Sequence, residues 1–266
     1  MTARWEELAE GVVRRRLPGW DETVGAVRGP DGVLVVDTGA TLRCGAELRR
    51  ELRALFGAPV RWVALTHPHF DHVLGTAAFA GVQVYGAVGT AALFSAGPAD
   101  PAGPADPAKP AGPAGPAKPA APGTSAFADA LRADAVRHGV SPDEAASAAD
   151  ALVAPHHQVS GELTLSLGGD RRVMLANVGP GHTGHDLAVL VPGSPEVVFC
   201  GDLVEESGEP QAGRDAHPAA WPAALDRLLA LGGPHARYVP GHGAVIDAAF
   251  VRAQRAALAR RFGVPR

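Results

Sequence analysis

The sequence has few cysteines, little net charge and no long apolar run. Cys44 and Cys200 are its only cysteines, and their spacing matches neither a zinc knuckle nor a redox motif. A net charge of -4 gives no basic field for a phosphate backbone, so we expect no nucleic-acid partner. No window reaches the roughly 18 apolar residues that span a bilayer, which argues against a membrane protein. The first ten residues also lack the apolar run of a secretory signal, so a reduced, cytoplasmic protein fits best.

The length and composition predict one domain over residues 1–266. Hydrophobic residues make up 46% of the chain, enough for a sizeable core. A low-complexity insertion rich in proline, alanine and glycine occupies residues 96–123, and every third residue from Pro98 to Pro122 is proline. This period suits polyproline II and a semi-rigid surface segment, with a proline ligand for a partner as the alternative. The insertion supplies none of the metal ligands expected below, so deletion of Pro98 to Pro122 should leave the metal content unchanged.

Hydrophobic periodicity and turn residues predict alternating strands and helices. The triplet Arg14, Arg15 and Arg16 is interpreted as a solvated turn or helix end. We expect a β-hairpin from residues 23–27 and 33–37 and strands over 60–65, 82–85, 163–167, 172–176, 187–191 and 196–200. Helices are expected over 42–56, 73–80, 127–138, 142–153 and 221–231.

A cluster of metal-ligating residues follows the strand over 60–65. The segment Thr66-His67-Pro68-His69-Phe70-Asp71-His72 contains three imidazoles and a carboxylate within six residues. Borderline metals such as zinc prefer this set of ligands. In extended backbone alternate side chains share a side, so His67 and His69 can bind one ion while Asp71 and His72 reach a neighbouring one. The cluster therefore predicts a metal site.

Three glycine-containing turns supply further ligand types, each at the end of an expected strand. They are Gly179-Pro180-Gly181-His182-Thr183, Cys200-Gly201-Asp202 and Pro240-Gly241-His242-Gly243. Glycine lets the backbone turn sharply there and leaves the ligand side chain open toward a shared cavity.

The motif H-x-H-x-D-H, followed by G-H-T, G-D and P-G-H-G, resembles the metallo-β-lactamase superfamily over about residues 23–245. The resemblance implies an α/β fold, a four-layer αβ/βα sandwich with the metals at one edge between two sheets. It implies two divalent metal ions, zinc first and iron or manganese as alternatives. The implied ligands are His67, His69 and His182 for the first ion, Asp71, His72 and His242 for the second, and Asp202 between them. Asp37, in a D-T-G segment, would orient a ligand or cap a turn.

Two metals ~3.5–4 Å apart lower the pKa of a shared water, so no side-chain nucleophile is needed. We therefore expect a metal-bridging hydroxide to attack a carbonyl, with Asp71 as the catalytic residue that orients it. The short segment after His242 argues against glyoxalase II-like thioesterases, which resemble this pattern but add a helical glutathione-binding region. In one zinc β-lactamase subclass a cysteine replaces Asp202 and a lysine follows three positions later, where this chain has Glu205 and would repel a carboxylate-bearing lactam.

The sequence thus predicts a hydrolase of a small-molecule ester, thioester or lactone. A mononuclear iron persulfide dioxygenase, which shares the H-x-H-x-D-H motif, is the first alternative. A non-enzymatic module that binds a partner through the proline-rich loop is the second. We expect Cys200 to be a buried hydrophobe, His185 and His217 to lie on the surface, and Phe70 to form an apolar wall of the pocket.

Overall fold

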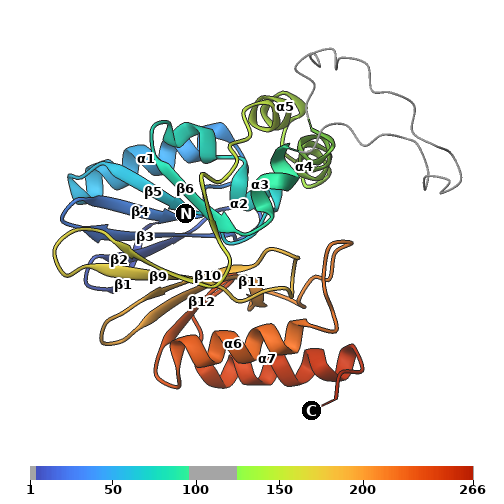
Figure 1. The fold of residues 1–266 in the computed structure, drawn as a ribbon. Coiled ribbons are helices and arrows are strands. Elements are labelled where there is room, and N and C mark those ends of the chain that lie inside the picture. Colours follow the sequence, from blue (N-terminus) through green and yellow to red (C-terminus); the bar gives the residue numbers. More distant parts are fainter. Residues whose placement is uncertain (1–3, 96–124, 266) are drawn as a thin grey trace, which may run out of the picture.

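The computed structural model describes residues 4–95 and 125–265 and contains two β-sheets that pack face to face between helices (Figure 1). The first sheet has seven strands in sequential order, and its neighbours from β4 to β7 run parallel. The expected hairpin is present as β3 and β4. The strands are β1 (Glu6–Ala9), β2 (Val12–Arg16), β3 (Thr23–Gly29), β4 (Gly32–Val36), β5 (Val60–Ala64), β6 (Gln83–Ala87) and β7 (His157–Val159).

The second sheet has five strands in the order β12-β11-β10-β9-β8. Its strands pair antiparallel except for β11 and β12, which run parallel, so both of these end at the same edge. The strands are β8 (Glu162–Ser166), β9 (Arg172–Asn177), β10 (Leu187–Val191), β11 (Val197–Glu205) and β12 (Arg237–His242).

Helices cover the outer face of each sheet. In Figure 1, α1, α3, α4 and α5 lie beyond the first sheet, and α6 and α7 lie beyond the second. Local signals define α1: Thr41 accepts a hydrogen bond from the Cys44 amide at its start, and Gly57 ends it in the left-handed conformation. The helices are α1 (Leu42–Phe56), α2 (Phe70–Val73), the 3-10 helix η1 (Thr76–Phe79), α3 (Thr90–Ser95), α4 (Ala126–Arg137), α5 (Pro142–Asp150), α6 (Trp221–Gly232) and α7 (Ala248–Arg261).

Three buried apolar clusters hold the four layers together. Leu48 and Val63 belong to the cluster between helices and the first sheet. Leu34 and Val189 belong to the cluster between the sheets, and Trp221 belongs to the one under α6 and α7. Burial of apolar surface on both faces of each sheet explains their nearly continuous hydrophobic strands. The expected four-layer αβ/βα sandwich is confirmed.

The interpretation of the arginine triplet as a solvated turn is wrong. It forms most of β2, where Arg14 is 5% exposed and Arg15 is 8% exposed. Adjacent strand residues face opposite sides of a sheet, so each arginine meets different partners. Arg14 binds the Glu6 carboxylate and the Gly243 carbonyl, whereas Arg15 pairs with carboxylates of α1.

Other element boundaries differ from the sequence predictions. The helix expected over 73–80 is replaced by α2, which begins at Phe70, and by the separate η1. At Gly75 the backbone amide leaves the helical pattern and donates to the Gly39 carbonyl at 2.8 Å, and only glycine fits there because an added Cβ would lie 2.0 Å from the Thr38 carbonyl oxygen. The strand expected to end at Cys200 continues to Glu205. No residue range was predicted for the strands β1, β2, β7 and β12 or for the helices α3 and α7, and the proline-rich insertion lies outside the described residues.

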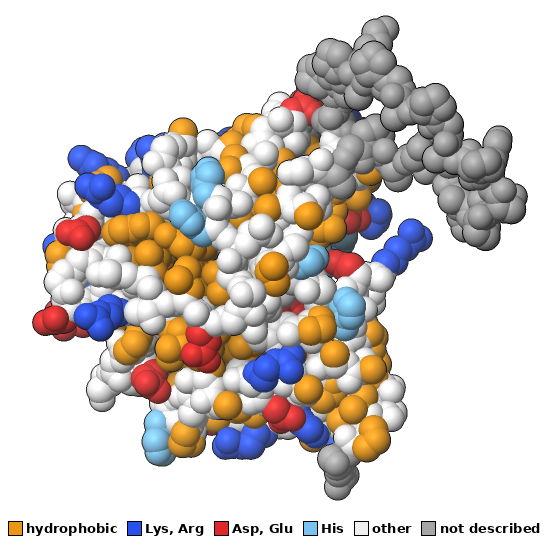
Figure 2. All heavy atoms as spheres, in the orientation of Figure 1, with side chains coloured by type: hydrophobic (Ala, Val, Ile, Leu, Met, Phe, Trp, Pro, Cys, Tyr) orange, Lys and Arg blue, Asp and Glu red, His pale blue; other side chains and the backbone are white. Residues whose placement is uncertain are grey.

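The surface carries both signs of charge. Figure 2 shows lysine and arginine side chains interspersed with acidic ones over the face in view. Within residues 4–95 and 125–265, no helix is long and apolar enough to cross a membrane.

Candidate metal centre

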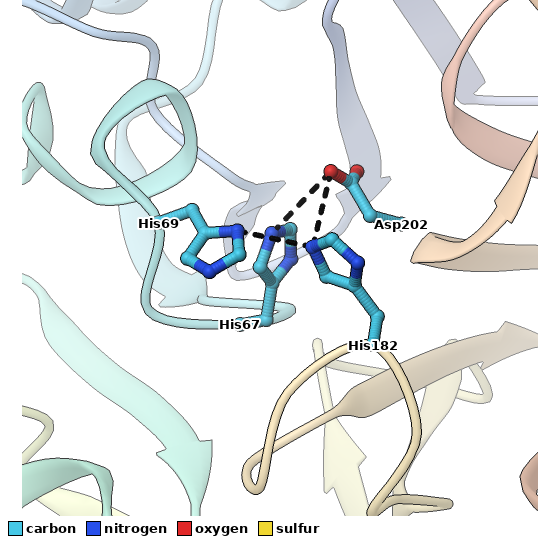
Figure 3. A group of neighbouring side chains, drawn as sticks. All are labelled: His67, His69, His182 and Asp202. Carbon is cyan, nitrogen blue, oxygen red and sulfur yellow. Dashed lines mark hydrogen bonds and ion pairs between the residues drawn. The ribbon is translucent and has the colours of Figure 1, made fainter. Parts of the chain in front are cut away.

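The ends of several strands converge at one edge of the sandwich, and their loops carry the predicted site residues. Residues 66–72 follow β5, the His182 turn joins β9 to β10, and Asp202 and His242 lie within β11 and β12. All seven predicted ligands come together here in two neighbouring groups. Figure 3 shows His67, His69, His182 and Asp202 with their polar atoms directed toward one another.

The first group contains His67, His69, His182 and Asp202. One ligand atom from each lies within 4.8 Å of the others. The His182 Nε2 and His69 Nδ1 atoms are 3.0 Å apart, and the Asp202 Oδ2 atom lies 3.5 Å from both His67 Nε2 and His182 Nε2. Three imidazole nitrogens and a carboxylate oxygen around one point form a ligand set suited to zinc or a similar ion.

The second group contains Asp71, His72 and His242. The Asp71 Oδ2 atom lies 3.4 Å from His242 Nε2 and 3.7 Å from His72 Nε2. Asp202 also faces this group, with oxygens 3.3 Å from His72 Nε2 and 3.4 Å from His242 Nε2. The Asp202 carboxylate thus contacts both groups and occupies the position that a bridging ligand requires.

Each of the five imidazoles makes a hydrogen bond through the ring nitrogen that faces away from the site. Where the partner is a carbonyl or carboxylate oxygen, that nitrogen must donate, which leaves the inner lone pair available to a cation. The His67 Nδ1 atom donates to Thr66 Oγ1, because the Thr66 hydroxyl itself donates to Asp37. The other pairs are His69 Nε2 with Asp215 Oδ2, His72 Nδ1 with Asp37 Oδ2, His182 Nδ1 with Gln211 O, and His242 Nδ1 with Trp20 O, at 2.7–3.0 Å.

Asp37, directly after β4, binds both ends of the segment 66–72 that carries four of the predicted ligands. It has a φ of 63°, and its carboxylate accepts hydrogen bonds from the Thr66 amide at 2.8 Å and the Thr66 hydroxyl at 2.7 Å. It also accepts from His72 Nδ1 at 2.8 Å. The structure thereby shows that Asp37 contacts the predicted ligand His72, as the first of the two roles left open by the sequence requires.

Burial and neighbouring charges shift the pKa values of the site histidines in opposite directions. Burial lowers the pKa of His67 well below its usual value and that of His182 to about 4, so both imidazoles are neutral at pH 7. Burial also acts to lower the pKa of His242, but the Asp202 carboxylate outweighs it and raises that pKa to about 10. The same balance raises the pKa of His72. The second group therefore has an excess of negative charge that attracts protons or another cation.

The buried atoms of the site fit bound metal. Among the described residues, His67 Nε2, His72 Nε2 and Asp202 Oδ1 are buried without a hydrogen-bond partner. Unpartnered buried polar atoms are costly, and cation ligation would satisfy all three.

Glycines make the close approach of Asp202 possible. A Cβ on Gly241 would lie 1.8 Å from Asp202 Oδ1, so no larger residue fits there without moving the carboxylate. Gly201, directly before Asp202, has a φ of 53° and packs against Thr66. These contacts give the glycines of the G-D and P-G-H-G motifs a steric role.

Sequence reasoning missed three residues that hydrogen-bond to imidazoles of the site, Asp215, Trp20 and Gln211, and it missed the buried Glu22 nearby. Asp215 lies in the loop after β11, where no motif distinguishes it, and it binds His69. Trp20 contributes only its carbonyl oxygen, which side-chain patterns cannot reveal. Glu22 is fully buried beside His242 and was not recognised as a polar core residue.

The remaining candidates lie outside the two groups. Cys200 is buried in β11, as expected, and burial raises its pKa. His185 donates to the Val88 carbonyl. Phe70 is 8% exposed and packs edge-on against Trp20 and face-on against His138.

The layers and the paired His/Asp groups define a class of αβ/βα proteins whose candidate metal centre lies at the edge between two sheets. The sequence model of the metallo-beta-lactamase superfamily matches residues 17–242, and the chain belongs to this superfamily. No curated protein matches the chain.

Solved structures share the fold. A metallo-beta-lactamase from Pontibacter korlensis superposes with a TM-score of 0.67 and 19% identity, covering 97% of this chain and 99% of that one. The metallo-beta-lactamase FIM-1 from Pseudomonas aeruginosa, in its mono-zinc form, gives a TM-score of 0.65 and 19% identity, covering 100% and 98%. At this identity the likeness shows the fold, while superfamily membership and the His/Asp groups support a metal-dependent hydrolase.

Proposed function

We propose that the protein is a dinuclear metal-dependent hydrolase that attacks the carbonyl of a small ester, thioester or lactone and cleaves its acyl C–O or C–S bond. The observation that carries this proposal is Asp202, whose carboxylate lies 3.3–3.5 Å from imidazole nitrogens of both ligand groups. Zinc is the ion that the donor set favours, with iron or manganese as alternatives. Bound divalent ions would lower the pKa of water and polarise the carbonyl under attack.

The chain's own residues would bind the ions and orient the nucleophile. In the first group, the His67 and His182 imidazoles are neutral and need lose no proton to bind a cation. In the second group, the Asp71 carboxylate faces the space between His72 and His242. From there Asp71 would accept a hydrogen bond from the attacking water and hold it in line with the substrate carbonyl.

Glu205 restricts the substrate. One of its carboxylate oxygens lies within 4.8 Å of ligand atoms of Asp202 and His242. Its Oε1 atom accepts a hydrogen bond from the Ser207 hydroxyl at 2.6 Å. A substrate carboxylate placed at this end of the site would meet like charge. We therefore propose neutral or cationic substrates rather than carboxylate-bearing lactams.

Metal restoration and a substrate panel test the proposed function. The chelated protein would be reloaded with Zn, Fe or Mn and assayed on p-nitrophenyl esters, thioesters, lactones, lactams and phosphodiesters, with metal counted by mass spectrometry. We expect two ions per chain and turnover of at least one carbonyl class. His242→Ala should lose the second ion, whereas His235→Ala, an exposed histidine outside the site, should keep both.

Two results would overturn the proposal. One iron per chain with oxygen uptake on glutathione persulfide would indicate a persulfide dioxygenase. If the protein bound a partner equally well with and without His69→Ala, and turned over no substrate with any metal, it would be a binding module.

A further inference from the structure

Glu22 is a buried carboxyl residue to which the proposed chemistry assigns no role. It lies directly before β3 and is 1% exposed, and neither of its carboxyl oxygens has a hydrogen-bond partner among the described residues. Its backbone is fixed on both sides: its carbonyl accepts from the Leu17 amide at 2.7 Å, and it forms an antiparallel bridge with His242. The residue therefore lies next to a ligand of the second group.

A partnerless buried carboxyl is costly to the fold. Transfer of such a group from water to an apolar interior is unfavourable, and ionisation there is more unfavourable still. Burial accordingly raises the pKa of Glu22 well above its usual value. The charges that act on it most strongly are those of His72, Asp71, Asp37 and His242, which all belong to the second group or hold it in place.

Other unpartnered buried atoms at this edge already have an explanation. His67 Nε2, His72 Nε2 and Asp202 Oδ1 face a common point and are expected to bind metal. Glu22 shares their burial and lack of partners but belongs to none of the groups whose ligand atoms lie within 4.8 Å of one another. It therefore supplies no ligand atom, and a carboxylate at this position would act on the site through its charge.

The two groups differ in their surroundings. The first contains three imidazoles and the shared Asp202. The second contains Asp71 and shared Asp202, and Asp37 lies behind His72. A divalent cation bound on this side would favour the ionised form of Glu22, and at short range in a poorly screened interior that negative charge would stabilise the cation in turn.

We infer that Glu22 is a positioning residue for the second metal ion, which it holds at Asp71, His72 and His242 by its buried negative charge. This inference rests on the proposed two-metal function. It predicts that replacement of Glu22 weakens binding at the second group and spares the first. It also predicts that the metal-free protein does not need Glu22 for stability, because removal of an unpartnered ionisable group relieves the burial cost.

The test compares wild type with Glu22→Gln, which keeps the shape and removes the charge. Apo-proteins would be titrated with zinc against a chromophoric chelator, and apo-state stability would be measured by urea unfolding. We expect wild type to bind two ions and Glu22→Gln to bind the second roughly 10- to 100-fold more weakly, with first-site affinity unchanged. The apo-state midpoint should be equal or higher. Glu162→Gln, the same change at an exposed strand position, should match wild type.

Different outcomes separate the two hypotheses. If wild type itself binds only one ion, the two-metal function fails. If wild type binds two and Glu22→Gln binds both with unchanged affinity, the role of Glu22 is refuted. Equal weakening at both sites together with a lower midpoint would also refute it, since that result indicates a structural residue. If Glu22→Gln does not fold, Glu22→Met, an uncharged side chain of similar length, is subject to the same criteria.

Discussion

The Asp37→Asn substitution tests whether the site depends on the tautomers of its histidines. The Asp37 Oδ2 atom accepts two hydrogen bonds, from the Thr66 hydroxyl at 2.7 Å and from His72 Nδ1 at 2.8 Å. Asparagine keeps one acceptor oxygen, which can remain on the Thr66 amide, and places an NH2 group where Oδ2 was. That group cannot accept from His72, so the proton moves to Nε2, the nitrogen that faces the second group.

The magnitude follows from the lost lone pair. Substitution of a residue that orients a metal-bound histidine typically costs 10- to 100-fold in affinity, and we expect about 100-fold here because the contact is buried and direct. This corresponds to about 2.8 kcal/mol of metal-binding free energy. Loss of buried hydrogen bonds should also lower the apo-state free energy of unfolding by about 1–3 kcal/mol.

Zinc competition titration and urea unfolding would measure the two effects separately. Asp150→Asn, the same chemical change at an exposed residue at the end of α5, should leave both quantities unchanged. Second-site affinity within about threefold of wild type for Asp37→Asn would refute the reasoning, because the imidazole would then keep its lone pair without an acceptor behind it.

Three further predictions follow from single contacts. Gly241→Ala should displace Asp202, remove at least one ion and destabilise the protein by about 1–3 kcal/mol, as measured by metal analysis and urea unfolding. Asp215→Asn should weaken first-site zinc affinity about tenfold, because His69 loses a charged acceptor on a half-exposed loop. Burial raises the pKa of Asp186 to about 7, so the folded state retains this proton above the pH at which the unfolded chain loses it. Apo-state stability should therefore fall as pH rises from about 4 to 7, and Asp186→Asn should flatten the fall.

Matched variants control these predictions. Gly161→Ala adds a Cβ where nothing lies within 4 Å, so it should retain both ions. Asp143→Asn alters an exposed carboxylate and should leave both metal affinity and the pH dependence as in wild type. If Gly241→Ala kept full metal content, if Asp215→Asn bound zinc normally, or if Asp186→Asn left the pH slope unaltered, the corresponding contact would not have the assigned effect.

The sequence alone predicted those features that local chemistry specifies. The spacing of Leu48 and Leu52 with the stop at Gly57 gave α1 its observed bounds. The motifs around His67, His182, Asp202 and His242 named all seven residues that converge, since each motif joins a ligand type to the turn that exposes it. Such signals lie within a few residues of one another, where periodicity and turn preference act.

Only the tertiary structure decided which distant groups meet. Arg14 and Arg15 are buried because β2 pairs inside the first sheet, with partners as far away in sequence as Gly243. Asp215 and the Trp20 carbonyl acquire their roles from loops that fold over the ligand imidazoles. A backbone bridge brings Glu22 beside His242, 220 positions along the chain, and its carboxyl finds no hydrogen-bond partner there within the described ranges. The predicted ligands thus follow from short motifs, whereas the hydrogen-bond partner of the outer nitrogen of each imidazole and the charge nearby depend on long-range packing.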